Sequence, residues 1–169
     1  MSPVAMTELY NRYQLRIFQY CRHRISDPEQ VKDIVGDIFL KVLIDLRKGT
    51  KTKKFRPWIF TIAHNEVANA YRERRWEHSL DGAQLSADPG PSPEDVAAAA
   101  SNLDFLRTLM KQLKESHRVV IELRLAGLTT PEICDVLGKS YSWVSSTQHR
   151  GFAQLRKLFD DYRAMGDQA

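Results

Sequence analysis

The feature that most constrains the fold is a run of apolar residues at helical spacing between residues 27 and 46. They recur at the i, i+3, i+4 positions of one helix face, namely Val31, Ile34, Val35, Ile38, Phe39, Val42, Leu43 and Leu46. Asp27 and Pro28 come directly before this run, in the order of a side-chain cap followed by a first-turn proline. The segment therefore predicts a strongly amphipathic helix that buries one side.

The rest of the chain has the same helical period. We expect further helices at residues 5–25, 57–76, 93–113, 117–126, 130–137 and 141–158. No segment alternates apolar and polar residues as a half-buried strand does, and the sequence contains no glycine-rich phosphate loop and no internal repeat. The fold class is therefore expected to be all-α.

Charge is distributed unevenly along the 169 residues. The net charge is +4, but residues 51–76 hold seven basic residues against two acidic ones, while residues 77–104 hold six acidic residues and no Lys or Arg. Three prolines in the acidic stretch disfavour regular structure, namely Pro89, Pro91 and Pro93. We interpret 78–92 as a linker between two small helical domains, 1–77 and 93–169. It is either a solvated tether or a segment that packs back and masks the basic patch.

Composition and spacing exclude several classes of protein. Hydrophobic residues make up 43% of the chain, yet no apolar stretch is long enough to span a membrane, and the N-terminus lacks the pattern of a secretory signal. The two cysteines are too far apart for a CxxC site, and the five histidines show no metal-ligand spacing. There is no catalytic triad or paired-acid arrangement. We therefore expect a cytoplasmic protein without metal, cofactor or enzymatic activity.

The C-terminal segment has the layout of a helix-turn-helix. Gly127 ends one helix, Thr129 and Glu132 stand at capping-box spacing, and Gly138 marks a tight turn before a final amphipathic helix. The second helix of such a unit enters the DNA major groove by its N-terminal end. The side chains expected to be exposed there are Tyr141, Ser142, Ser145, Ser146, His149 and Arg150. A structural three-helix bundle shows the same spacing and remains open.

A second segment combines cations, aromatic rings and amides. Two basic clusters, 51–56 and 72–75, bracket a helix that carries Trp58, Phe60, Asn65, Asn69 and Tyr71. Cations pair with phosphates and flat rings stack on exposed bases, so this pattern is typical of single-stranded nucleic-acid binding. The aromatic residues would also be buried in any amphipathic helix. The flanking cations and exposed amides are therefore the stronger signal.

Together these segments resemble the extracytoplasmic-function (ECF, group 4) sigma factors of the bacterial sigma-70 family, from Leu9 to about Leu158. DIVGDIFLKV (33–42) resembles the core-binding helix of that family, and FRPWIFTIAHNEVANAYRERR (55–75) resembles its −10 recognition helix. The segment from Leu113 to Leu158 resembles the helix-turn-helix that reads the −35 element. The resemblance implies an RNA polymerase specificity subunit that selects promoters and assists melting of the −10 region without ATP.

The resemblance also implies roles for individual residues. Docking on the polymerase core is implied for Asp33, Asp37 and Lys41. Contact with the −10 strand is implied for Lys53, Lys54, Phe55, Arg56, Trp58, Asn65, Asn69, Arg72, Arg74 and Arg75. Contact with the −35 element is implied for Thr130, Tyr141, Ser142, Trp143, Ser145, Ser146, His149 and Arg150. The implied partners are the β and β′ subunits of core polymerase, promoter DNA and the anti-sigma factor that is typical of the group.

The chain departs from the family pattern at several positions. Gly36 stands where the core-binding helix usually has glutamine, and Asn69 stands where aspartate is common. Ser142 and Trp143 replace a usual Gly-Thr pair. We therefore expect weaker polymerase contact and an unusual −35 sequence or weaker −35 binding. Two other functions remain open: a stand-alone helix-turn-helix regulator that binds duplex DNA by itself, and a sigma-like protein that titrates polymerase or a regulator.

Overall fold

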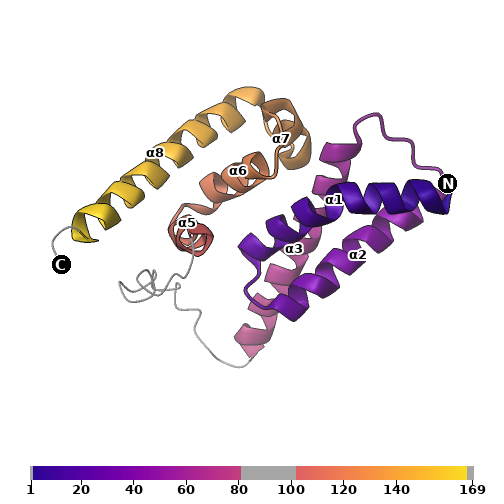
Figure 1. Ribbon diagram of the computed structural model, residues 1–169, viewed down its shortest axis with the longest axis horizontal. Helices are drawn as coiled ribbons and strands as arrows, with labels where there is room; N and C mark the ends of the chain where they lie inside the picture. Colours follow the sequence, from indigo (N-terminus) through magenta and orange to yellow (C-terminus); the bar gives the residue numbers. More distant parts are fainter. Residues whose placement is uncertain (1, 81–101, 167–169) are drawn as a thin grey trace.

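The computed structural model describes residues 2–80 and 102–166 (Figure 1). Every regular element among these residues is an α-helix, which confirms the all-α class. The helices are α1 (Pro3–Arg24), α2 (Pro28–Arg47), α3 (Phe55–Leu80), α5 (Asn102–Lys111), α6 (Glu115–Leu125), α7 (Thr130–Leu137) and α8 (Tyr141–Gly166). Within the described residues, no helix has both the length and the apolar character that a membrane span requires.

Helices α1, α2 and α3 form an N-terminal bundle whose core contains the predicted apolar stripe. Asp27 caps α2, since its carboxylate accepts a hydrogen bond of 3.0 Å from the backbone N–H of Glu29, and Pro28 occupies the first turn. Six stripe residues are buried, namely Val31, Ile34, Val35, Ile38, Phe39 and Val42. Burying each such side chain stabilises the fold by about 1.5–3 kcal/mol, so this stripe fixes how α2 faces α1 and α3.

Helices α5 to α8 form the C-terminal half. The predicted capping box is present at the start of α7, where Thr129 accepts from the Glu132 N–H and Glu132 accepts from the Thr129 N–H at 2.8 Å. Gly138 ends α7 with a left-handed φ of 62°, which turns the chain sharply into α8. Where α8 crosses α6, a Cβ on Gly151 would lie 2.8 Å from Ile121 Cδ1, so this crossing needs glycine.

The two halves pack against each other through α7. Helix α7 lies along α3, and α6 contacts α1, as the ribbon shows (Figure 1). A single hydrophobic cluster therefore joins Ile17, Val31 and Phe60 of the N-terminal bundle to Leu123 and Ile133 of the C-terminal half. A smaller cluster under α5 and α8 contains Met110, Leu113 and Ile121. The helix-turn-helix is thus packed onto the N-terminal bundle in this structure.

Two helices extend beyond their predicted ends. Helix α3 runs from Phe55 to Leu80, beyond the 57–76 predicted, and so continues past the expected start of the linker at 78. Helix α8 continues to Gly166 because its last turns pack on α5 and the residue after it. The ring of Phe159 contacts that of Phe105, and the Tyr162 hydroxyl accepts a hydrogen bond from the Gln112 side-chain amide. The predicted helix start near residue 93, and the linker from 81 to 92, lie outside the described residues.

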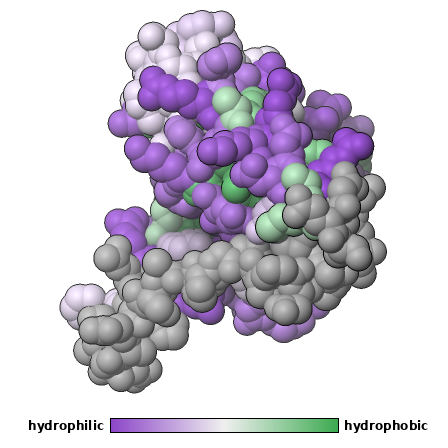
Figure 2. All heavy atoms as spheres, turned by 90° about the vertical axis from the view of Figure 1, so that its left-hand side faces the viewer, coloured by the Kyte–Doolittle hydropathy of each residue, from purple (hydrophilic) through white to green (hydrophobic). Residues whose placement is uncertain are grey.

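The surface at the α5 and α8 end is mostly polar. Figure 2 shows the side of the molecule that lies at the left of Figure 1, and hydrophilic side chains cover most of its coloured area. Hydrophobic side chains reach the surface there in small patches between them. Several exposed apolar side chains belong to α8, namely Tyr141, Phe152, Phe159 and Met165. Polar residues therefore make up most of the coloured surface in this view.

Candidate polymerase and nucleic-acid interfaces

The predicted polymerase-docking residues lie on one exposed face of α2. Asp33, Asp37 and Lys41 are spaced four residues apart, so they follow one another along the helix surface, and all three are exposed. Leu40 adds an apolar side chain that is 54% exposed. Gly36 lies on the same surface, and nothing lies within 4 Å of the position its Cβ would take. The face therefore combines two carboxylates, one cation and an apolar side chain, all open to a partner.

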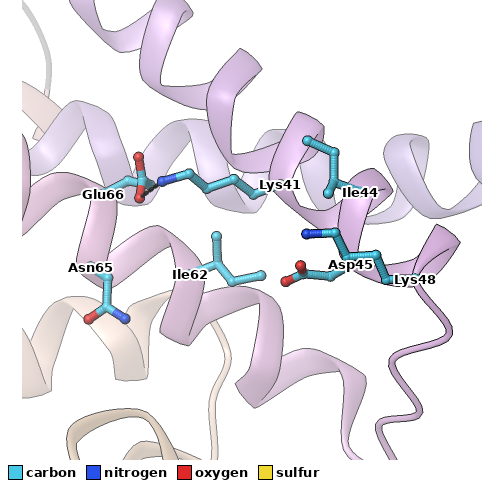
Figure 3. Close-up of a pocket in the computed structure, with 7 residues that line it drawn as sticks. All are labelled: Lys41, Ile44, Asp45, Lys48, Ile62, Asn65 and Glu66. Atoms are coloured by element: carbon cyan, nitrogen blue, oxygen red, sulfur yellow. Dashed lines mark hydrogen bonds and ion pairs between the residues drawn. The ribbon is translucent and has the colours of Figure 1, made fainter.

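A pocket opens at the seam between α2 and α3, beside this face (Figure 3). It has a volume of about 410 Å³ and is lined by Lys41, Ile44, Asp45, Lys48, Ile62, Asn65 and Glu66. Lys41 forms an ion pair with Glu66 across the seam. A predicted docking residue and the predicted −10 residue Asn65 therefore lie in one cavity.

Two of the predicted −10 cations are engaged by acidic residues of α7. Lys54 Nζ lies 2.9 Å from Asp135 Oδ2, and Arg56 Nε lies 2.9 Å from Glu132 Oε1. Burial raises the pKa of Glu132, but its hydrogen bonds with Thr129 and with Arg56 outweigh this, and the pKa lies below its usual range. Lys53 is exposed. The loop before α3 and the first turn of α3 thus present cations, two of which the first helix of the helix-turn-helix partly neutralises.

The aromatic residues at the start of α3 contact one another rather than solvent. Phe55 and Trp58 are half-buried, with ring centroids 5.3 Å apart, and Phe55 also contacts Tyr13 at 5.3 Å. Both belong to the margin of the main hydrophobic cluster. Their ring faces therefore contribute mainly to packing in this arrangement.

Farther along α3, polar side chains form an exposed line. Asn65, Asn69 and Arg72 recur at helical spacing and are all exposed, and Arg72 donates a hydrogen bond to the Asn69 amide oxygen. Arg74 is exposed as well, whereas the side chain of Arg75 lies outside the described residues. This line of amides and cations leads away from the pocket along the helix.

Most predicted −35 residues lie at the start of α8. Tyr141 is 62% exposed, and the side chains of four more of these residues are also exposed, namely Ser142, Ser145, His149 and Arg150. Ser146 and Thr130 are half-buried. Trp143 is also half-buried, since it packs against the main cluster, and Lys139 Nζ lies 5.5 Å from its ring centre. Trp143 therefore anchors the turn between α7 and α8. The open face consists of Tyr141, Ser142, Ser145, His149 and Arg150, and the expectation that Ser146 is exposed is wrong.

The sequence did not reveal a buried ionic cluster between the halves. Glu122 of α6 accepts hydrogen bonds from Arg24 of α1 at 3.1 Å and from Arg118 at 2.7 Å. Arg118 also donates to the backbone carbonyl of His23, and Arg24 also pairs with Glu115. Burial raises the pKa of Glu122, and the two arginines oppose this effect. The only signal of this cluster in the sequence was that Glu122 lies among apolar residues of a predicted helix.

Comparisons with known proteins show which family the chain matches. The model of Sigma-70 region 2 matches residues 9–77, and that of Sigma-70 region 4 matches residues 109–157. The chain is 30% identical to RNA polymerase sigma factor YlaC of Bacillus subtilis, over 90% of this chain and 91% of the relative. It is also 24% identical to the ECF RNA polymerase sigma factor SigW of Bacillus subtilis, over 93% of this chain and 90% of the relative.

Solved structures support the same assignment. The structure of CnrH in complex with the cytosolic domain of CnrY has a TM-score of 0.71 and 26% identity, covering 95% of this chain and 90% of that one. CnrH of Cupriavidus metallidurans is also 30% identical in sequence over 92% of this chain and 87% of its own length.

The chain belongs to the ECF group of the sigma-70 family and functions as an RNA polymerase sigma factor in transcription initiation. Neither matching model describes an enzyme family.

Proposed function

We propose that this sigma factor uses residues 1–77 to bind core polymerase and the −10 element, and residues 93–169 to bind the −35 element, with a linker that begins after the end of α3 at Leu80 and not at residue 78. The exposed face of α2 would dock on the polymerase core through Asp33, Asp37 and Lys41. Charged groups at the rim of such an interface chiefly set orientation and association rate, while Leu40 adds apolar area. Because core polymerase works on chromosomal DNA, the proposal includes a cytoplasmic location.

The observation that carries the proposal is the pocket between α2 and α3. At about 410 Å³ it falls in the size range of small-ligand sites. We propose that it receives one base of the non-template −10 strand after that base leaves the stack. Unstacking costs a few kcal/mol, and contacts in the pocket offset that cost, so melting depends on sequence. Asn65 supplies both a donor and an acceptor for the edge of the base.

Cations around the pocket would hold the strand itself. Lys53 and Lys54 lie just before α3, Arg56 lies in its first turn, and Arg72, Arg74 and Arg75 lie farther along it. Each contact with a phosphate releases counterions, so binding should weaken steeply as salt rises. Lys54 and Arg56 must exchange their partners on α7 for phosphates. Separation of α7 from α3 is therefore part of the proposed path to promoter binding.

The start of α8 would read the −35 element in the major groove. Tyr141, Ser142, Ser145 and His149 form its open face, and Arg150 reaches phosphate or base. Hydroxyl groups can donate to or accept from any base, so a face rich in serine supports recognition partly through DNA shape. CnrH is solved with the cytosolic domain of CnrY. A protein partner that controls access to these surfaces belongs to the proposal.

Run-off transcription on randomised promoter templates tests this function. Bacterial core polymerase is assayed with and without the chain, and transcripts are sequenced. We expect initiation that depends on the chain and falls at least tenfold with Asn65→Ala, whereas Asn11→Ala, an exposed amide on α1, leaves it unchanged. A stable complex with core but no initiation would favour a titrating protein. Specific duplex binding by the chain alone, without any polymerase complex, would favour a stand-alone regulator.

A further inference from the structure

The α2–α3 pocket contains one carboxylate that nothing else in the described residues engages. Of its two acidic residues, Glu66 is paired with Lys41. The Asp45 side chain has no hydrogen-bond or ion-pair partner in the described part of the chain, although its backbone carbonyl accepts from Thr50. Figure 3 shows the Asp45 carboxylate directed across the pocket toward Ile62. An unused acceptor therefore faces the cavity.

The remaining lining groups define how a flat ring would sit there. Ile44, 40% exposed, and Ile62 offer apolar surface from the two helices, which suits the faces of a base. Lys48 and Asn65 supply donors in the same cavity. With the ring between the aliphatic side chains, the polar edge of the base would meet Asp45 and Lys48 at the end of α2 and Asn65 on α3 (Figure 3).

We infer that Asp45 is a specificity determinant of this pocket and selects an unstacked base that carries an exocyclic amino group, against thymine. The inference rests on the proposed function of the pocket. An ionised carboxylate only accepts hydrogen bonds, so it pairs with the amino group of cytosine, adenine or guanine. Thymine presents a single N–H between two carbonyl oxygens, and a carboxylate repels both oxygens. Discrimination therefore comes from a repulsive contact as well as an attractive one.

The substitution Asp45→Asn separates this role from a structural one. The amide keeps the size of the side chain but adds a donor, so it can donate to a thymine carbonyl while it accepts from the thymine N–H. The variant should therefore admit thymine at one promoter position and leave the preferences elsewhere unchanged. Asp160→Asn, on the exposed surface of α8, makes the same chemical change far from the pocket and serves as the matched control.

The test is run-off transcription by the holoenzyme on templates randomised across the −10 element, with sequencing of the products. With the unsubstituted chain, one −10 position should favour an amino-bearing base over thymine by roughly tenfold. Asp45→Asn should bring that ratio to about one there, with thermal stability unchanged, and Asp160→Asn should leave it as it was. Active holoenzyme whose base preferences do not respond to Asp45→Asn overturns this inference alone. An absence of chain-dependent initiation overturns the proposed function with it.

Discussion

Arg56 Nε lies 2.9 Å from Glu132 Oε1, so a cation proposed for the −10 strand is bonded to the first helix of the helix-turn-helix. Lys54 and Asp135 repeat this relationship at 2.9 Å. The two acidic side chains of α7 thereby occupy the cations that DNA phosphates would need. Under the proposed function, −10 phosphates would therefore compete with Glu132 and Asp135 of α7 for these two cations.

Neutralising these two carboxylates should expose the cations to DNA. We expect the double variant Glu132→Gln/Asp135→Asn to bind single-stranded DNA about 2- to 30-fold more tightly, because each of the two partly exposed pairs contributes about 0.2–1 kcal/mol. Fluorescence anisotropy with a labelled oligonucleotide measures the affinity. Asp160→Asn/Asp161→Asn changes the net charge equally on the exposed surface of α8. An equal gain in that control would show that only net charge matters.

Glu122 should be essential for stability. Its side chain is fully buried between Arg24 and Arg118, and the Arg24 side chain is only 8% exposed. Replacing it by glutamine leaves Arg118 without a counter-charge and Arg24 with only the exposed Glu115, so Glu122→Gln should lower the free energy of unfolding by about 3–5 kcal/mol. Urea denaturation measures this change, and the exposed Glu73→Gln should alter it by less than about 0.5 kcal/mol. A loss below about 1 kcal/mol for Glu122→Gln would contradict the buried pairing.

Stability should fall as the pH drops below neutrality, in part through His64. Burial lowers the pKa of His64 from its ordinary 6.5, and Arg24 lowers it further. Because the unfolded chain then binds the proton more readily, the stability is present above pH 6.5 and is lost as pH falls toward the folded-state pKa.

A hydrogen bond offers a specific check on this titration. The Tyr20 hydroxyl, whose pKa burial raises, lies 3.0 Å from His64 Nδ1, and a neutral imidazole with its proton on Nε2 can accept a hydrogen bond from that hydroxyl. Urea denaturation of the unsubstituted chain should give a lower free energy of unfolding at pH 5.5 than at pH 7.5. His64→Gln should show a smaller pH-dependent loss, with the remainder due to His23, whose pKa burial also lowers. An identical slope in the variant would exclude a contribution from His64.

Gly36 should be replaceable with a gain in stability. It lies on the exposed face of α2, and nothing lies within 4 Å of the position a Cβ would take. Alanine there removes a helix penalty of about 1 kcal/mol, so Gly36→Ala should raise the free energy of unfolding by nearly that amount in urea denaturation. In contrast, Gly151→Ala should destabilise, because its Cβ would meet Ile121. A neutral result at both positions would contradict the helix packing described above.

Short-range signals predicted much of the fold. The Asp27 cap, the apolar stripe of α2 and the Thr129–Glu132 capping box depend on residues within one helix, and each is found as expected. The family, recognised from motif order, is also confirmed. The pocket, in contrast, needs the relative placement of α2 and α3, which no local spacing encodes. The Arg24–Glu122 pair joins residues 98 positions apart. The order of charged residues along the sequence does not indicate which distant residues form such ion pairs.

Trp143 illustrates the limit at a single residue. Its position early in the recognition helix predicted contact with DNA, yet packing against the core holds it half-buried. A tryptophan at the start of a helix can either contact DNA or pack into the core. Which of the two occurs depends on where the neighbouring helix lies. The individual site residues therefore remain predictions, whereas the class of protein follows from the sequence.

Opening of the −10 region tests the central claim most directly. Holoenzyme assembled with the chain is placed on a promoter recovered from the randomised templates, and unpaired thymines are detected by permanganate. The account predicts that DNA opens without ATP, that Asn65→Ala abolishes opening while the holoenzyme still binds the duplex, and that Asn11→Ala behaves like the unsubstituted chain. Full opening by Asn65→Ala would contradict the assignment of the α2–α3 pocket to the unstacked base.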